Sequence, residues 1–118
     1  MKAGMMRRAG SSHILFPLVN RTETFVERTR GLLGTRGLTA EEGLLISPCN
    51  SVHTFFMRFP IDVVFLDRNN TVMHITTMLR PFRFAMALKA LSVLELKAEQ
   101  ALITELRPGD RLVWEKLS

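Results

Sequence analysis

The chain has 118 residues, of which 47% are hydrophobic and 23% charged, and it carries one cysteine and a formal net charge of +5. This length fits one domain, and the hydrophobic content excludes a disordered chain. One cysteine cannot form an internal disulfide, so a disulfide-stapled secreted scaffold is excluded and a reducing compartment is favoured.

The first residues, MKAGMMRRAG, are basic, and apolar periodicity begins only at Ile14. We therefore predict a flexible basic tail over residues 1–12 and a single globular domain over residues 13–118. The apolar run ILFPLV contains Pro17 and is shorter than the about 7–15 residues of a secretory signal or the roughly 20 of a membrane span. We expect a cytoplasmic protein with no membrane partner.

The run HILFPLV predicts a strand that leads into a turn at NRTETF. In the following TETFVERTRGLLG, apolar residues recur at helical spacing, which predicts a short helix over residues 24–33. Thr22 or Thr24 is a suitable N-cap, and Gly34 is a suitable stop just beyond the last leucine. LLIS then predicts a short apolar strand that ends at Pro48.

The stretch CNSVHTFFMRFPIDVVFLD, residues 49–67, is divided by Pro60. A proline cannot donate to a sheet ladder and disfavours helix in the residue before it, so SVHTFFM and IDVVFLD are predicted as two extended segments. Alternation places the odd-numbered residues of 51–57 on one face of the first segment and the even-numbered residues on the other. The second segment is apolar except at Asp62, which predicts a strand buried on both faces.

DRNN predicts a hairpin turn because Asn69 and Asn70 tolerate positive φ, so residues 61–67 should pair antiparallel with residues 71–78. LRPFRFAMALKA predicts a basic, aromatic loop or short helix, and LSVLELKA predicts a further strand. AEQALITEL predicts one or two helical turns, and RPGDRLVW predicts a tight turn into a final strand. Together these elements predict an α+β fold: a single compact domain with a curved, mainly antiparallel, barrel-like β-sheet and two short helices.

Cys49 and His53 are candidates for a catalytic nucleophile and its base. A histidine activates a thiol by removing its proton or by placing a positive charge beside it. On an extended strand the two residues would lie about 13 Å apart, so contact requires a turn near Pro48 and Asn50. A small enzyme that uses Cys49 or Asp62 with His53 therefore stays open as an alternative, and the sequence does not decide whether the protein is an enzyme.

Five side chains could supply ligand atoms to a metal ion: Cys49, His53, Met57, Asp62 and His74. A metal site needs three or four such side chains close together, and the sequence has neither paired cysteines nor a His-x-x-x-His spacing. We therefore expect no metal site and no cofactor.

Asp62 stands in an otherwise apolar strand, where an unpaired carboxylate would be expensive to bury. It must reach solvent, cap the turn around Pro60, or pair with a cation such as Arg58 or an arginine within residues 80–83. Two interpretations follow. Asp62 is a structural carboxylate that ties the turn, or it is a polar anchor on the floor of a pocket.

Large apolar residues crowd the segment SVHTFFM, and they cannot all point inward from one strand. At least one should face a cleft or a partner, where aromatic residues and methionine favour binding. The candidate residues for binding a small ligand or a protein partner are Phe55, Phe56, Met57, Arg58 and Asp62.

A basic face is a further possibility. Between Arg68 and Leu94 the chain has four Lys/Arg residues and no acid, a composition that attracts phosphates. No nucleic-acid motif accompanies these cations, and the chain has no tyrosine. We expect weak, salt-sensitive and non-specific nucleic-acid binding rather than a specific nucleic-acid partner.

RTRGLLG at residues 28–34, the central stretch at 49–67, VLELKA at 93–98 and PGD at 108–110 are the elements by which the chain resembles the uncharacterised family known as domain of unknown function 192. The resemblance extends over residues 13–117. The recurrent residues of the family fall on Gly31, Leu32, Phe56, Met57, Pro60, Asp62, Phe65, Asp67, Leu94, Glu95, Leu96, Gly109 and Asp110. The resemblance supports the predicted fold and places the site at the central stretch, but it implies no established reaction.

We therefore predict a small binding module whose pocket or partner surface is built around the motif CNSVHTFFMRFPID. The alternatives are the small enzyme described above and non-specific nucleic-acid binding through the basic face.

Overall fold

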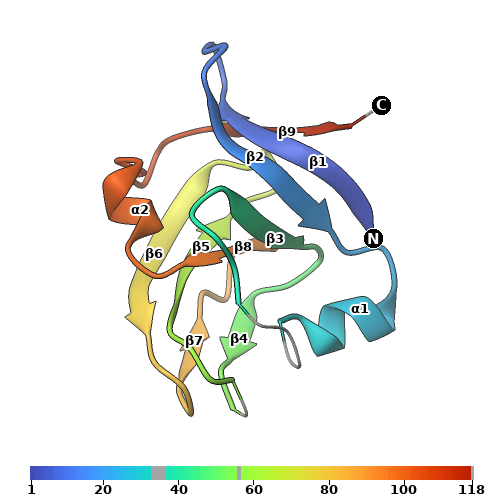
Figure 1. The fold of residues 1–118 in the computed structure, drawn as a ribbon, viewed down its shortest axis with the longest axis vertical. Coiled ribbons are helices and arrows are strands. Elements are labelled where there is room, and N and C mark those ends of the chain that lie inside the picture. The colour runs from blue at the N-terminus through green and yellow to red at the C-terminus, as the bar shows by residue number, and fades with distance from the viewer. Residues whose placement is uncertain (33–36, 56, 118) are drawn as a thin grey trace.

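The computed structural model describes residues 1–32, 37–55 and 57–117. Within these residues the chain forms nine strands and two helices (Figure 1). The strands are β1 (Lys2–Arg8), β2 (Ile14–Arg21), β3 (Glu42–Ile46), β4 (Ser51–His53), β5 (Ile61–Leu66), β6 (Val72–Leu79), β7 (Phe84–Met86), β8 (Ser92–Lys97) and β9 (Leu112–Lys116). The helices are α1 (Phe25–Arg30) and α2 (Gln100–Ile103).

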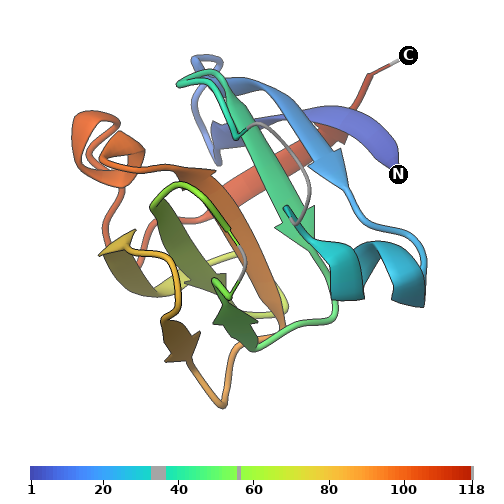
Figure 2. The same ribbon diagram turned by 60° about the horizontal axis from the view of Figure 1, so that its bottom comes forward.

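Seven strands form one sheet in the order β6-β5-β8-β3-β2-β1-β9, and β4 pairs with β7 in a separate small sheet. Neighbouring strands are antiparallel except β2 and β3, which are parallel. The large sheet curves until its edges meet at one point, where Thr71 and Arg111 form an isolated bridge. Since no continuous ladder joins these edges in the described residues, the predicted barrel-like sheet is curved but open (Figure 2). The predicted single α+β domain with a mainly antiparallel sheet is confirmed.

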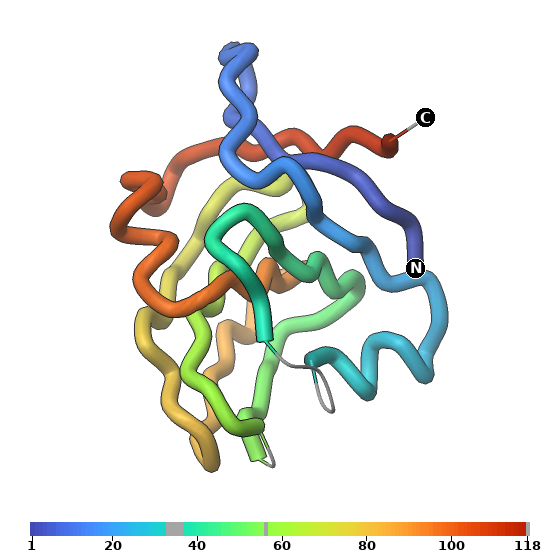
Figure 3. Tube along the Cα trace, in the orientation of Figure 1, coloured from blue at the N-terminus to red at the C-terminus, as the bar shows by residue number. Residues whose placement is uncertain are grey.

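The structure corrects the predicted flexible tail over residues 1–12. Lys2–Arg8 forms β1, which pairs antiparallel with both β2 and β9, and Figure 3 shows the hairpin of β1 and β2 projecting from the body of the molecule. Met6 is fully buried, and Gly4 leaves room for the indole of Trp114 against the backbone. The tail prediction rests on the basic charge of this segment and on an apolar periodicity assigned only from Ile14 onward. The alternation of Gly4 and Met6 with outward-facing residues is what places it in the sheet.

β5 is the central buried strand that the sequence predicts, and every one of its residues is buried. It pairs antiparallel with β6 on one side and with β8 on the other. In the turn between β5 and β6, Asn70 has a φ of 60°, which asparagine tolerates, and Asp67 Oδ1 accepts a hydrogen bond from Asn69 N at 2.8 Å. The predicted hairpin is confirmed.

Two hydrophobic cores lie on opposite faces of the large sheet. Alternate residues of β8 point to opposite faces, so that Val93 joins the first core whereas Leu94 and Leu96 join the second. The first core also receives Val52 from β4. Position 95 of β8 therefore faces the first core.

The segment after β4 departs from the predicted extended run. β4 ends at His53 because Thr54 ties the chain into a turn. The Thr54 hydroxyl donates to Arg80 O at 2.6 Å and accepts from Arg83 N at 2.8 Å. Alternation therefore stops at this turn. The strand partner of β4 is β7, which lies where the sequence predicted a loop or short helix.

The predicted N-cap of α1 is Thr24, which forms a capping box with Glu27. Thr24 Oγ1 accepts from Glu27 N at 3.1 Å, and Glu27 Oε1 accepts from Thr24 N at 3.2 Å. The helix is shorter than the predicted residues 24–33, because Gly31 already turns the chain away with a φ of 52°. The predicted stop, Gly34, lies outside the described residues. Neither helix of the described residues has the length and apolar character to cross a membrane.

Candidate functional site

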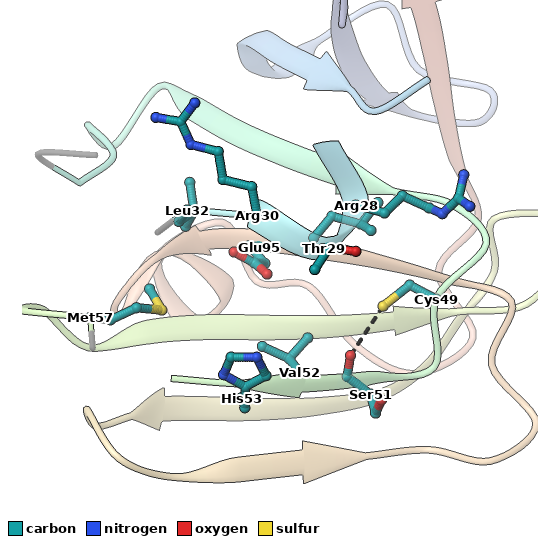
Figure 4. A pocket seen from close by; sticks show the side chains of 12 residues that line it. Arg28, Thr29, Arg30, Leu32, Cys49, Ser51, Val52, His53, Met57 and Glu95 are labelled. Atoms are coloured by element: carbon teal, nitrogen blue, oxygen red, sulfur yellow. Dashed lines mark hydrogen bonds between the residues drawn. The ribbon is translucent and has the colours of Figure 1, made fainter. Parts of the chain in front are cut away.

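A pocket opens between the C-terminal end of α1 and the first core (Figure 4). Its walls come from α1 and the residues just after it, from β3 and β8, and from β4 with its flanking residues. The cavity has a volume of about 60 Å³. Its lining residues are Arg28, Thr29, Arg30, Gly31, Leu32, Ile46, Cys49, Ser51, Val52, His53, Met57 and Glu95.

Glu95 lies at the floor of this pocket, and its carboxyl projects from β8 toward α1 (Figure 4). The residue is 4% exposed, and Oε2 is buried with no hydrogen-bond partner among the described residues. Burial raises the pKa of Glu95 to about 8, because the ionised form would lose its hydration. At pH 7 the group is therefore a neutral acid. A buried polar atom without a partner costs roughly 1–3 kcal/mol, which a molecule that supplied the partner would recover.

Two arginines of α1, Arg28 and Arg30, line the pocket, and their side chains extend away from Glu95 in opposite directions (Figure 4). The Arg28 guanidinium lies 5.8 Å from the centre of the Phe25 ring, and Arg30 is the last residue of the helix. Their charges give the mouth a positive potential. Gly31 then brings the backbone close to the acid, since a Cβ at this position would lie 3.8 Å from Glu95 Oε1.

Cys49 lines the pocket as a neutral thiol. Its Sγ donates to Ser51 O at 3.1 Å, and no hydrogen bond joins it to the imidazole of His53 in the part of the chain that the structure describes. Burial raises the pKa of Cys49; Glu95, once it ionises at higher pH, adds to this effect, whereas the charge of Arg28 opposes it. The structure thus brings the two predicted catalytic residues to one pocket without making them a nucleophile and base.

The other candidate residues of the central stretch lie in different places. Met57 is buried and lines the pocket, whereas Arg58 is exposed and does not line it. Phe55 is 43% exposed, and its ring centre lies 5.5 Å from that of the exposed His53. One large apolar residue of this segment therefore faces outward. Phe56 lies outside the described residues.

Asp62 lies away from the pocket. It is fully buried, and its two carboxylate oxygens accept from Met78 N and Ala101 N, each at 2.9 Å. Met78 has a φ of 52°, and Ala101 is in the first turn of α2, so the carboxylate ties β5 to the end of β6 and to a helix N-terminus. This geometry supports the structural interpretation of Asp62, with partners other than the predicted Pro60 turn or Arg58. The acid on the pocket floor is Glu95.

The basic segment after β6 presents Arg80 and Arg83 together with the exposed rings of Phe82 and Phe84. None of these four residues lines the pocket. No three His, Cys, Asp or Glu side chains of the described residues are grouped so that they could hold a metal ion.

Sequence reasoning missed Glu95, Arg28 and Arg30 as site residues. A signal for Glu95 exists, because it interrupts the apolar run VLEL just as Asp62 interrupts IDVVFL, and an acid in a buried strand needs a partner. The two arginines give no comparable signal, since the side of a short helix that borders a pocket depends on tertiary packing.

Comparison with known proteins yields one family and three relatives. The sequence profile of the family DUF192, described as "Uncharacterized ACR", matches residues 6–114. A UPF0127 protein from Pyrococcus abyssi is 38% identical over 65 residues, which are 54% of this chain and 55% of that protein. The chain thus matches about half the length of this relative.

Two crystal structures share the fold. A protein of unknown function from Novosphingobium aromaticivorans has a TM-score of 0.76 and 24% identity, and the match covers 95% of this chain and 84% of that one. A Sinorhizobium meliloti protein, proposed to be a transcription regulator, has a TM-score of 0.80 and 21% identity, with 96% of this chain and 92% of that one covered. At these identities the likeness shows the fold alone.

Proposed function

The chain belongs to the uncharacterised family DUF192, and we propose that it is a small binding module whose ligand site is the pocket beneath α1. The observation that carries this proposal is the buried Oε2 of Glu95, which has no partner among the described residues. Folded proteins satisfy nearly all buried polar groups, so an unsatisfied one on a residue that lines a cavity points to a partner from outside the chain. A bound ligand supplies that partner.

The state of Cys49 favours binding over covalent catalysis. The thiolate is the reactive form of cysteine, and the raised pKa of Cys49 keeps the thiol protonated at pH 7. Its hydrogen bond to Ser51 O also holds the sulfur away from a base. The cavity of about 60 Å³ suits a small molecule better than a protein segment. The module therefore binds a small ligand without forming a covalent bond to it.

A thermal-shift screen of small polar compounds tests the proposal with a blocked pocket as reference. Thr29 is an exposed residue of α1 that lines the pocket, so Thr29→Trp should cover the mouth. Thr39→Trp is the matched control, because Thr39 is also exposed and does not line the pocket. A ligand at a concentration of about 100 Kd stabilises the folded state by about 2.7 kcal/mol, which raises the melting temperature by roughly 10 °C.

The proposal predicts at least one compound that stabilises the wild type and Thr39→Trp but not Thr29→Trp. A library in which every stabilising compound acts equally on all three proteins, or in which none acts on the wild type, would contradict it.

A further inference from the structure

The hydrogen-bonding character of the pocket floor limits what can bind there. A protonated carboxyl carries one O–H donor and a carbonyl acceptor, whereas an ionised carboxylate only accepts. Glu95 holds its proton at pH 7, because burial raises its pKa to about 8. The floor therefore offers a donor, and a ligand atom with a lone pair is its complement.

The charged groups around the pocket floor favour a ligand of one particular charge. The titratable groups that face the pocket are Arg28 and Arg30 of α1, Cys49, His53 and Glu95 itself. The charge of Arg28 is felt by a lining residue, since it lowers the pKa of Cys49 against the larger effect of burial. Glu95 is the one acid among the described lining residues, and it is neutral at pH 7. The potential in the pocket is therefore positive, so it attracts an anion and repels a cation.

The size of the cavity limits the ligand further. A cavity of about 60 Å³ is small, so it takes a group of a few heavy atoms. Leu32, Ile46, Val52 and Met57 supply an apolar wall around it. A charged group with a short apolar stem fits this combination of a donor, two cations and an apolar wall.

We infer that the ligand of this pocket is a small organic anion, a carboxylate that accepts a hydrogen bond from the Glu95 carboxyl and is balanced in charge by Arg28 and Arg30. This inference rests on the proposed binding function and names the ligand class of the same site. In this binding mode Glu95 acts as a neutral hydrogen-bond donor and not as a counter-ion.

The pH dependence of binding separates this ligand class from the opposite one. An anion that bonds to the protonated carboxyl loses affinity as Glu95 ionises, by about tenfold per pH unit above the pKa of the acid. A cation that pairs with the ionised carboxylate instead gains affinity as the pH rises toward that pKa. The two classes therefore give pH dependences of opposite sign.

Acetate and acetamidinium are matched probes, because the two ions have nearly the same shape and opposite charge. Each is titrated into the full chain at pH 6.5 and pH 9, and the amide NMR shifts of Gly31 and Val52, which line the pocket, report the dissociation constant. We expect acetate to shift both amides at pH 6.5, to bind at least fivefold more weakly at pH 9, and to bind more tightly than acetamidinium at pH 6.5.

Three variants test which residues produce the affinity for acetate and its pH dependence. Glu95→Gln keeps a donor but cannot ionise, so acetate should bind within about threefold of the wild type and its pH dependence should vanish. Glu95→Leu removes the donor and should weaken acetate at least tenfold. Arg28→Gln should weaken acetate several-fold, whereas the matched control Arg107→Gln, at an exposed arginine outside the pocket, should not.

Each contrary result would overturn a different part of the proposal. Tighter binding of acetamidinium, with affinity that rises with pH and disappears in Glu95→Gln, would overturn the ligand class and leave the binding module standing. A pH dependence that persists in Glu95→Gln would assign the effect to another group and overturn the role of Glu95. If neither probe shifts Gly31 or Val52, the ligand class is wrong. The proposed function then fails as well only if the Thr29→Trp screen also finds no ligand.

Discussion

Replacement of Asp62 by asparagine keeps the size of the side chain but gives it an amide in place of two acceptor oxygens. In the wild type both carboxylate oxygens accept from backbone amides, Oδ1 from Met78 N and Oδ2 from Ala101 N. The asparagine NH₂ must face one of these N–H groups, so donor meets donor and one buried amide loses its partner. The variant should therefore lose stability through Met78 or Ala101.

The size of the loss follows from the burial of the site. Asp62 is fully buried, so water does not replace the lost bond. An unsatisfied buried N–H costs about 1–3 kcal/mol, and the remaining bond weakens by about 1 kcal/mol because its acceptor is no longer charged, so a total of roughly 2–4 kcal/mol is expected. With an unfolding entropy of about 2.1 cal/mol/K per residue, the melting temperature of this chain should fall by roughly 8–16 °C.

Thermal and urea denaturation of Asp62→Asn measure this loss, with Glu41→Gln as a control that removes a charge from an exposed side chain. The control should melt within about 2 °C of the wild type, as is usual for surface substitutions. The pocket of Asp62→Asn should still bind any ligand of the wild type below the melting temperature, because Asp62 does not line it. An Asp62→Asn protein that melts with the control, or one that folds fully and loses the ligand, would refute the structural role.

Glu95→Gln should become more stable relative to the wild type as the pH rises. Folded Glu95 has a pKa of about 8, against 4.5 for the free side chain. The contribution of Glu95 to the stability of the wild type is therefore fully present below pH 4.5 and is lost as the pH rises to about 8, on the order of 1 kcal/mol per pH unit. A difference in unfolding free energy between the two proteins that stays constant between pH 5 and pH 8 would contradict this. Cys49 should react with a thiol reagent at pH 7 more slowly than an exposed peptide cysteine does, because burial raises its pKa, and Cys49→Ser should stay folded. A rate equal to that of the peptide would show the thiol to be unshielded. Gly4→Ala should destabilise the protein by roughly 2–4 kcal/mol, because the new Cβ would collide with the Trp114 indole and break its hydrogen bond to Val19 O. The fluorescence of Trp114, the one tryptophan of the chain, should change with it, and unchanged emission with unchanged stability would exclude the contact.

Local sequence pattern predicted the parts of the fold that depend on neighbouring residues. The apolar run of β5 and the turn at Asn70 specify a buried hairpin without reference to the rest of the chain, and both are confirmed. β1 escaped prediction because its place in the sheet depends partly on β9, a strand at the other end of the chain that brings Trp114 onto Gly4. Its basic charge and its short apolar pattern made the segment look like a tail.

The candidate site was predicted only in part, again because the missing part depends on tertiary packing. The sequence correctly indicated that an acid in an apolar strand needs a partner, and it selected Asp62 because the central stretch around it is rich in chemically active side chains. The structure shows that both carboxylate oxygens of Asp62 have backbone partners, whereas Oε2 of Glu95 has none among the described residues. Which of the two acids is satisfied depends on where α1 and α2 pack, and no local pattern contains that information.

The most direct test of this account is a ¹³C NMR titration of the Glu95 side-chain carboxyl in the full chain, with and without acetate. Glu95 should titrate with a pKa of about 8 in the protein alone, and with a higher pKa in the presence of acetate, because the bound anion stabilises the protonated acid. A pKa near the ordinary 4.5 would show that the carboxyl is hydrated or already partnered. A pKa that does not rise with acetate would show that Glu95 is not the donor to an anionic ligand.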